Sequence, residues 1–178
     1  KLIESPSALT ESDFMALADA YLVSLQRSDN AEAKDDAFMA LVAAHLGQRA
    51  GYVGVANKVM MALKPWRETL AGTVFDKMWV VVEAGNERLA GRPEAAIQRL
   101  QPALDGTELV QARVAMLAAA RDAGRQQLVA QQAEWLAAHR GRAYMEANAA
   151  QVLQTLNVID TRLASLQAAE AMSALGRV

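Results

Sequence analysis

Two histidines, His45 and His139, are the residues that a metal site or acid–base catalysis would most readily use. A working histidine on a helix usually has a second ligand or a carboxylate three or four positions away, because this spacing brings both side chains to one face. Neither histidine has such a neighbour. His139 precedes Arg140 near the expected end of a helix, where a cation interacts favourably with the helix dipole.

Acidic pairs and glycine clusters are the remaining candidates for chemistry. Asp35–Asp36 and Glu83 with Glu87 lie in amphipathic segments, a pattern typical of solvated helix faces. The glycines between positions 47 and 54 lack the Gly-Lys-Ser/Thr ending of a phosphate-binding loop, and no Gly-x-Ser-x-Gly elbow occurs. Cysteine is absent, which excludes disulfides, zinc–thiolate sites and thiol nucleophiles. We therefore expect no catalytic residues, no bound metal, no cofactor and no enzymatic activity.

Composition favours an all-α protein. Of 178 residues, 53% are apolar and only 5% aromatic, and alanine and leucine suit closely packed helices. Eighteen basic and twenty acidic residues give a formal charge of −2 and leave no basic excess for nucleic acid, which is not expected as a partner. No apolar run approaches the roughly 20 residues that span a bilayer, so no membrane contact is expected within this segment.

Helical spacing and capping residues divide the chain into segments. A lead-in over 1–9 precedes a helix capped by Thr10 or Ser12. Val80–Val82 is a β-branched run that is compatible with a short strand, although the wider window favours helix. The expected order is a helix to about Arg27, a helix from Ala31 to Leu46, a loop over Gly47–Gly54, and helices over Val55–Leu63, Arg67–Leu89, Pro93–Leu104, Thr107–Ala123 and Gln126–Ala138.

Two of these segments repeat one pattern 33 positions apart. Gly91 ends one helix and the next enters through Pro93, since glycine is favoured just past a helix end and proline in a first helical turn. Gly124 makes the second turn. The residues that share a helix face also correspond, namely Ala96, Leu100 and Ala103 with Val129, Ala133 and Leu136.

A turn glycine followed by small and apolar residues at this period resembles the tetratricopeptide repeat. Leu17-Ala-Asp-Ala-Tyr21 is similar to the Leu-Gly-x-x-Tyr of that family, whereas Glu83 and Glu87 replace its large residues. The resemblance implies a single helical-repeat domain over 1–178. Its antiparallel hairpins, over 10–140, would stack as a right-handed superhelix, with the clearest repeats at about 77–106 and 107–139.

The resemblance also implies a groove lined by the first helix of each hairpin. The residues carried over by position are Met78, Val81, Gly85, Arg88, Gln111, Val114, Ala118 and Arg121. Arg88 and Arg121 would stand in equivalent places and grip a carboxylate or an acidic segment. The alternative is that both arginines form ordinary salt bridges facing solvent. Asn86 and Arg113 are weaker candidates for the same surface.

The segment 142–175 is expected to be one long capping helix or a helix pair. Its apolar residues form a nearly heptad seam that would cover the last hairpin or, alternatively, join two copies of the chain. This homodimer seam consists of Leu153, Leu156, Ile159, Leu163 and Leu166.

Together these features predict a protein-interaction or scaffolding domain, a fragment of a larger bacterial protein, with a protein or peptide as partner. A regulatory role is one option for the larger protein. The cytoplasm is slightly favoured over the periplasm. The alternative from another class is a helical bundle that binds a small apolar ligand beside Trp66, Trp79 or Trp135, with Met60 and Met61 as adaptable walls.

Overall fold

The structure is a computed structural model that describes residues 9–27, 30–104 and 109–139, and the regular elements in these ranges are all helices. This confirms the all-α class. The elements are α1 (Glu11–Arg27), α2 (Asn30–Arg49), α3 (Gly54–Leu63), the 3₁₀ helix η2 (Lys64–Trp66), α4 (Val74–Leu89), α5 (Pro93–Leu104), α6 (Val110–Asp122) and α7 (Gln126–His139).

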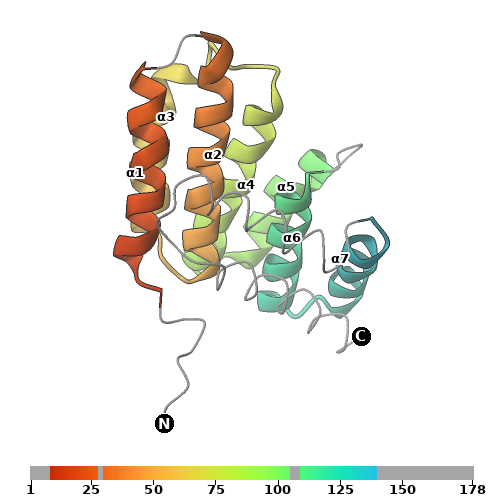
Figure 1. Ribbon diagram of the computed structural model, residues 1–178. Helices are drawn as coiled ribbons and strands as arrows, with labels where there is room; N and C mark the ends of the chain where they lie inside the picture. The colour runs from red at the N-terminus through yellow and green to blue at the C-terminus, as the bar shows by residue number, and fades with distance from the viewer. Residues whose placement is uncertain (1–8, 28–29, 105–108, 140–178) are drawn as a thin grey trace.

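Pairs of consecutive helices form the fold, which runs from α1 at one side to α7 at the other (Figure 1). α2 packs against α3, α4 against α5 and α6 against α7. The first helices of these three hairpins are neighbours, because α2 also packs on α4 and α4 on α6. We call α2, α4 and α6 the inner layer. α5 contacts both α4 and α6 and thereby joins the second hairpin to the third.

All three hairpin turns have the same backbone hydrogen bonds. Gly51, Gly91 and Gly124 have φ values of 96°, 84° and 72°, which favour glycine. In each turn the glycine N–H donates to the carbonyl three residues earlier, and the following N–H donates to the carbonyl five residues earlier. The α2–α3 turn is thus equivalent to the other two, although Gly51 precedes Gly91 by 40 positions rather than 33.

The extra length lies between α3 and α4 and explains one wrong prediction. The helix expected from Arg67 begins instead at Val74, after η2 and a series of turns. Thr73 caps it by accepting a hydrogen bond from the Phe75 N–H at 3.2 Å, and Gly72 beside it has a φ of 82°. Val80–Val82 lies inside α4, so the strand alternative is wrong.

A second prediction, the loop over Gly47–Gly54, is too long. α2 continues through Gly47 to Arg49, and α3 already begins at Gly54. Gly47 lies where three helices approach one another, since a β-carbon there would contact Val55 of α3 at 3.5 Å and Phe14 of α1 at 3.6 Å.

Apolar side chains fill the space between the layers in two clusters. The larger cluster runs from α1 to α6 and includes Phe14, Leu41, Phe75 and Met78. The smaller cluster lies between α6 and α7 and consists of Val110, Val114, Leu117, Ala133 and Leu136. In α5, the residues predicted to share one helix face, Ala96, Leu100 and Ala103, are all buried.

At the N-terminal end, Thr10 caps α1 as predicted. The Asp13 carboxylate accepts from the Thr10 N–H at 2.8 Å, and the Asp13 N–H donates to Thr10 Oγ1 at 3.4 Å. Thr107, the segment 142–175 and its Leu153–Leu166 seam lie outside the described residues. Among the described helices none is long and apolar enough to cross a bilayer.

Candidate functional site

The eight residues expected to line a groove divide into two groups. Met78 and Val81 are fully buried in the larger core, and Val114 packs between α6 and α7. Gln111 is also buried. These four side chains are held inside the protein and offer little to a partner. Gly85, Arg88, Ala118 and Arg121 remain, and the first three of them surround one hollow in the inner layer.

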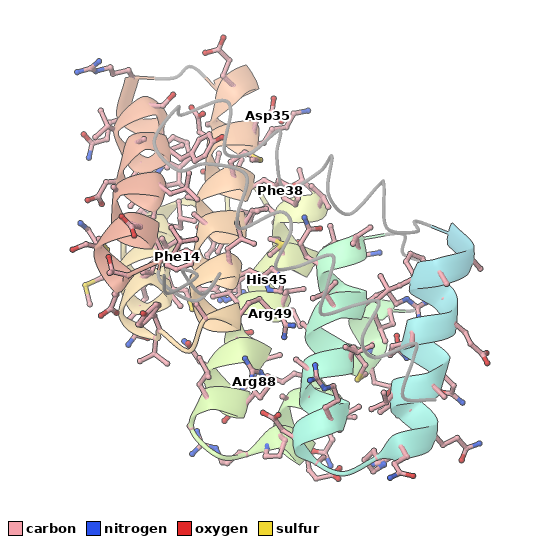
Figure 2. All side chains as sticks on the ribbon, turned by 60° about the horizontal axis from the view of Figure 1, so that its bottom comes forward. Phe14, Asp35, Phe38, His45, Arg49 and Arg88 are labelled. Carbon is pink, nitrogen blue, oxygen red and sulfur yellow. The ribbon has the colours of Figure 1, made fainter. Side chains whose placement is uncertain are left out.

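The hollow lies where α2, α4 and α6 meet, and His45, Arg49 and Arg88 come together there in Figure 2. Small residues on α4 and α6 make room for the larger ones on α2. The space inside is about 10 Å³, enough for a single water molecule. Its lining consists of His45, Gln48, Arg49, Ala84, Gly85, Arg88, Ala115 and Ala118.

The turn glycines relate these residues to one another. His45, Gly85 and Ala118 each lie six positions before a turn glycine, and Gln48, Arg88 and Arg121 each lie three positions before one. The inner layer therefore presents equivalent positions from three helices. Because α4 and α6 have Gly85 and Ala118 where α2 has His45, the imidazole occupies space that its counterparts leave open.

Gly85 allows α2 and α4 to approach closely. A β-carbon at this position would overlap the amide of Gln48. That amide is almost fully buried, and its Nε2 donates to the Val82 carbonyl at 2.7 Å and to Asn86 Oδ1 at 2.9 Å. Asn86, a weaker groove candidate, thus orients Gln48. The Gln48 Oε1 atom has no hydrogen-bond partner within the described structure.

Arg88 links all three helices of the inner layer. Its Nη2 donates to the Gln48 carbonyl near the C-terminal end of α2 at 3.1 Å, and its Nη1 pairs with Asp122 of α6 at 3.0 Å. The side chain is only 14% exposed, against 46% for Asp122. Arg88 therefore has a structural role within the protein itself, which does not depend on a partner. Arg121 is half-buried and lies in the last turn of α6.

His45 is buried and electrically neutral. Burial, reinforced by the positive charges of Arg49 and Arg88, lowers its pKa to about 3. Its Nε2 has no hydrogen-bond partner in the described part of the chain. Two buried polar atoms, His45 Nε2 and Gln48 Oε1, thus belong to residues that line the same hollow, a pattern that often marks a site for water or ligand.

Sequence reasoning missed His45, Gln48 and Arg49 as site residues. His45 was assessed only for metal and acid–base spacing, which it lacks. The available signal was the Gly51 turn, since counting back from it gives the same inner positions as counting back from Gly91 and Gly124. Within the described residues, no three metal-ligating side chains are grouped closely enough to hold an ion.

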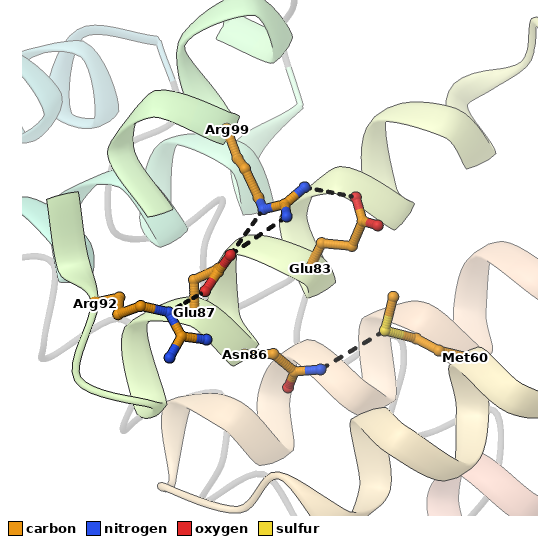
Figure 3. A network of polar contacts seen from close by, with 6 residues as sticks. All are labelled: Met60, Glu83, Asn86, Glu87, Arg92 and Arg99. Carbon is orange, nitrogen blue, oxygen red and sulfur yellow. Dashed lines mark hydrogen bonds and ion pairs between the residues drawn. The ribbon is translucent and has the colours of Figure 1, made fainter. Parts of the chain in front are cut away.

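Glu83 and Glu87 lie away from the hollow, where α4 faces α5. Figure 3 shows Glu87 between two arginines: Arg92 Nε donates to its Oε1 at 2.6 Å, and Arg99 Nε and Nη2 donate to its Oε2 at 3.3 Å. Arg99 also pairs with Glu83 at 3.7 Å. Hydrogen bonds from Arg92, with those from Arg99, lower the pKa of Glu87 below its ordinary value. At Glu83 and Glu87, ion pairs thus stand where the tetratricopeptide pattern has large residues.

The three tryptophans belong to two different parts of the core, with Trp66 and Trp79 at the larger cluster and Trp135 at the smaller one. Trp79 is buried beside Phe75, whereas Trp135 packs against the smaller core under Arg113. Met61 is 79% exposed. Neither the inner hollow nor the concavity between α5 and α7 described below is lined by tryptophan or methionine.

Comparison of the chain with protein-family models, characterised proteins and solved structures finds no match. Fold and site therefore define the class directly: an all-α protein of helical hairpins whose first helices lie side by side around a hollow with two arginines. Membership of the tetratricopeptide-repeat family stays a prediction.

Proposed function

We propose that this chain is a protein-interaction module of the tetratricopeptide-repeat kind, whose inner layer holds a segment of another protein. The supporting observation is the equivalence of α2, α4 and α6, which end in identical turns and pack side by side. Stacked hairpins of this type create extended surfaces that single helices lack. Two buried polar atoms of residues that line the hollow, His45 Nε2 and Gln48 Oε1, have no hydrogen-bond partner among the described residues.

The side chains along α2 suggest the chemistry of the partner. Asp35, Phe38, His45 and Arg49 recur at intervals of three, seven and four, so they share one helix face, and Figure 2 shows them following one another along α2. Asp35 is exposed, Phe38 and Arg49 are half-buried, and His45 is buried, so a partner would contact Asp35, Phe38 and Arg49. The face is thus acidic at one end, apolar in the middle and basic near Arg49 and Arg88.

A partner segment complementary to this face has an apolar side chain that packs against Phe38. It also has an acidic residue that binds Arg49. Arg49 is half-buried and lines the hollow beside Arg88, so we assign the carboxylate to the Arg49 side chain, while Arg88 links α2, α4 and α6 through the Gln48 carbonyl and Asp122. A carboxylate near Arg49 would gain a charge-assisted hydrogen bond in a partly desolvated setting. The segment would run along α2, with its acidic end towards the C-terminus of that helix.

The test uses short fluorescent peptides with one apolar residue and an acidic end, each paired with a twin in which Asp and Glu are replaced by Asn and Gln. Fluorescence anisotropy with the full chain measures affinity. We expect acidic peptides to bind more tightly than their twins and to weaken with added salt.

The two matched variants each remove one positive charge. Arg49→Ser removes it from α2 in the inner layer, and Arg92→Ser removes it beside Glu87, on the side of α4 that faces α5. Arg49→Ser should weaken acidic peptides about tenfold, a loss typical of one charge-assisted hydrogen bond, and Arg92→Ser should leave them unchanged. Equal effects of the two variants, or equal binding of acidic peptides and their twins, would contradict the proposal.

A further inference from the structure

A second polar concavity lies on another side of the molecule, between the C-terminal end of α5, the start of α6 and the middle of α7. It is an open concavity of about 520 Å³, within the range of roughly 300–1,000 Å³ typical of small-molecule sites. Its polar residues are Gln101, Arg113, Gln131 and Gln132, and its apolar walls are Pro102, Leu104 and Leu128. None of these residues lines the inner hollow.

Arg113 is the only charged residue in this lining of described residues. Its guanidinium lies over the Trp135 ring, 4.6 Å from the centroid, and its Nη1 donates to Gln132 Oε1 at 3.1 Å. Gln132 is itself buried, with 3% of its surface exposed. The planar group is therefore held in one orientation by an aromatic face and a buried amide.

No carboxylate among the described residues pairs with Arg113, and its buried Nε has no hydrogen-bond partner there. Burial also lowers the pKa of the Arg113 guanidinium below its ordinary value. A partly desolvated cation without a counter-ion is unfavourable unless an anion arrives to compensate it. Apart from Arg113, the described residues that line the concavity are glutamines and apolar residues, which would not repel that anion.

The other Arg–Trp contact shows that stacking alone does not explain this arrangement. Arg67 lies 4.4 Å from the centroid of Trp79, but it is exposed to solvent and belongs to neither concavity. Arg67 can therefore be hydrated freely, whereas Arg113 is partly buried and lines a concavity that also contains three glutamines.

We infer that the concavity binds an organic carboxylate, with the Arg113 guanidinium holding the carboxylate and Leu104, Pro102 and Leu128 contacting a short apolar portion. A fixed guanidinium fork matches the two oxygens of a carboxylate. The glutamine amides at the rim supply further donors. This site shares no lining residue with the inner hollow, so it stands or falls independently of the proposed protein-binding role.

The experiment titrates the full chain with 4-methylpentanoate, glutarate and propionate, and with 4-methylpentanamide as the uncharged counterpart. The Arg113 side-chain Nε–Hε signal in ¹⁵N–¹H NMR spectra reports the site, and calorimetry gives the affinity. We expect saturable shifts of this signal with at least one carboxylate and none with the amide.

Arg113→Gln should weaken the bound carboxylate at least about tenfold and Arg113→Lys less, because lysine keeps the charge but loses the fork. Arg67→Gln is the matched control and should change nothing. Circular dichroism verifies folding, and if Arg113→Gln does not fold, the contrast between acid and amide in the unmodified chain still decides the question.

Three results would overturn the inference: no saturable binding of any of the three acids, equal binding of acid and amide, or binding that survives unchanged in Arg113→Gln. The chain also carries Asp105 and Glu108 close in sequence to the site. If acids bind only after the double change Asp105→Asn and Glu108→Gln, the chain supplies its own carboxylate and the external ligand is excluded.

Discussion

The two sides of helix α4 hold their polar groups differently. Towards α5, both oxygens of Glu87 are bound by Arg92 and Arg99 within one hairpin. Towards α2 and α6, Gly85 and Arg88 make contacts that join different hairpins. The first side is satisfied by residues near in sequence and reached by solvent. The second holds the hairpins together and, within the described residues, leaves buried polar atoms unpaired, so changes there should cost more.

The largest expected effect is at Gly85. Gly85→Ala forces the Gln48 amide away and breaks its bonds to Val82 and Asn86, which should lower the free energy of unfolding by about 2–4 kcal/mol. Gly47→Ala is the matched change in α2, where the new methyl group would meet neighbours only at ordinary contact distances. It should be neutral or stabilise by up to about 1 kcal/mol. Urea unfolding followed by circular dichroism measures both, and equal losses would contradict the comparison.

The next effect is an acid sensitivity caused by His45. Its pKa is about 3 in the folded protein and near 6.5 in the unfolded chain, so only the unfolded chain takes up the proton as pH falls through this window. Stability from this group is complete above pH 6.5 and falls by up to about 1.4 kcal/mol per pH unit below it.

Unfolding measured between pH 6.5 and 5 isolates this effect from most carboxylates. His45→Leu should flatten the slope, whereas His139→Gln should retain it. A slope that persists in His45→Leu would show that the buried imidazole is not its source.

A smaller effect is expected at Arg88. Arg88→Met removes the links to Asp122 and to the Gln48 carbonyl and should lower the free energy of unfolding by about 1–3 kcal/mol. Asp122→Asn should cost less, because Asp122 is nearly half exposed. A double-mutant cycle gives the coupling between them. Strict additivity would mean that the ion pair contributes nothing to holding α4 on α6.

The smallest effect is expected on the opposite side of α4. Glu87→Gln weakens the pairs with Arg92 and Arg99, whose side chains are 63% and 46% exposed. Ion pairs with solvent-exposed partners contribute little, so the midpoint of thermal unfolding should fall by ~2 °C or less. Added salt should reduce even that difference. A loss as large as that of Gly85→Ala would invert the proposed ranking of the two sides.

Much of the fold was predictable because its signals are local. Gly91, Pro93 and Gly124 mark where helices end and begin, and helices α5 and α7 were predicted to within a residue at the ends that these residues mark. The start of α4 was missed because apolar spacing continues back through Leu70, whereas Gly72 and Thr73 determine the boundary. The predicted loop began too early, at Gly47, for a related reason. Gly47 is small because helices pack closely around it, and it does not form a turn.

The candidate site was predictable only in part. Position within a repeat identified Gly85, Arg88 and Ala118, but it could not show that Met78 and Val81 are covered by neighbouring helices. The α2 contribution was hidden because the connection through η2 lengthens the spacing from 33 to 40 residues. Pairing of Arg88 with Asp122 depends on distance in space, which no spacing within one helix reveals.

The shared turn at Gly91 and Gly124 has a consequence for engineering. Residues 91–123 run from the start of one turn to the residue before its counterpart, so they form a complete cassette. Duplicating this cassette in frame after residue 123 should graft one more helix pair into the stack without creating an unfamiliar junction. A lengthened chain of this kind would be a direct way to enlarge its surface.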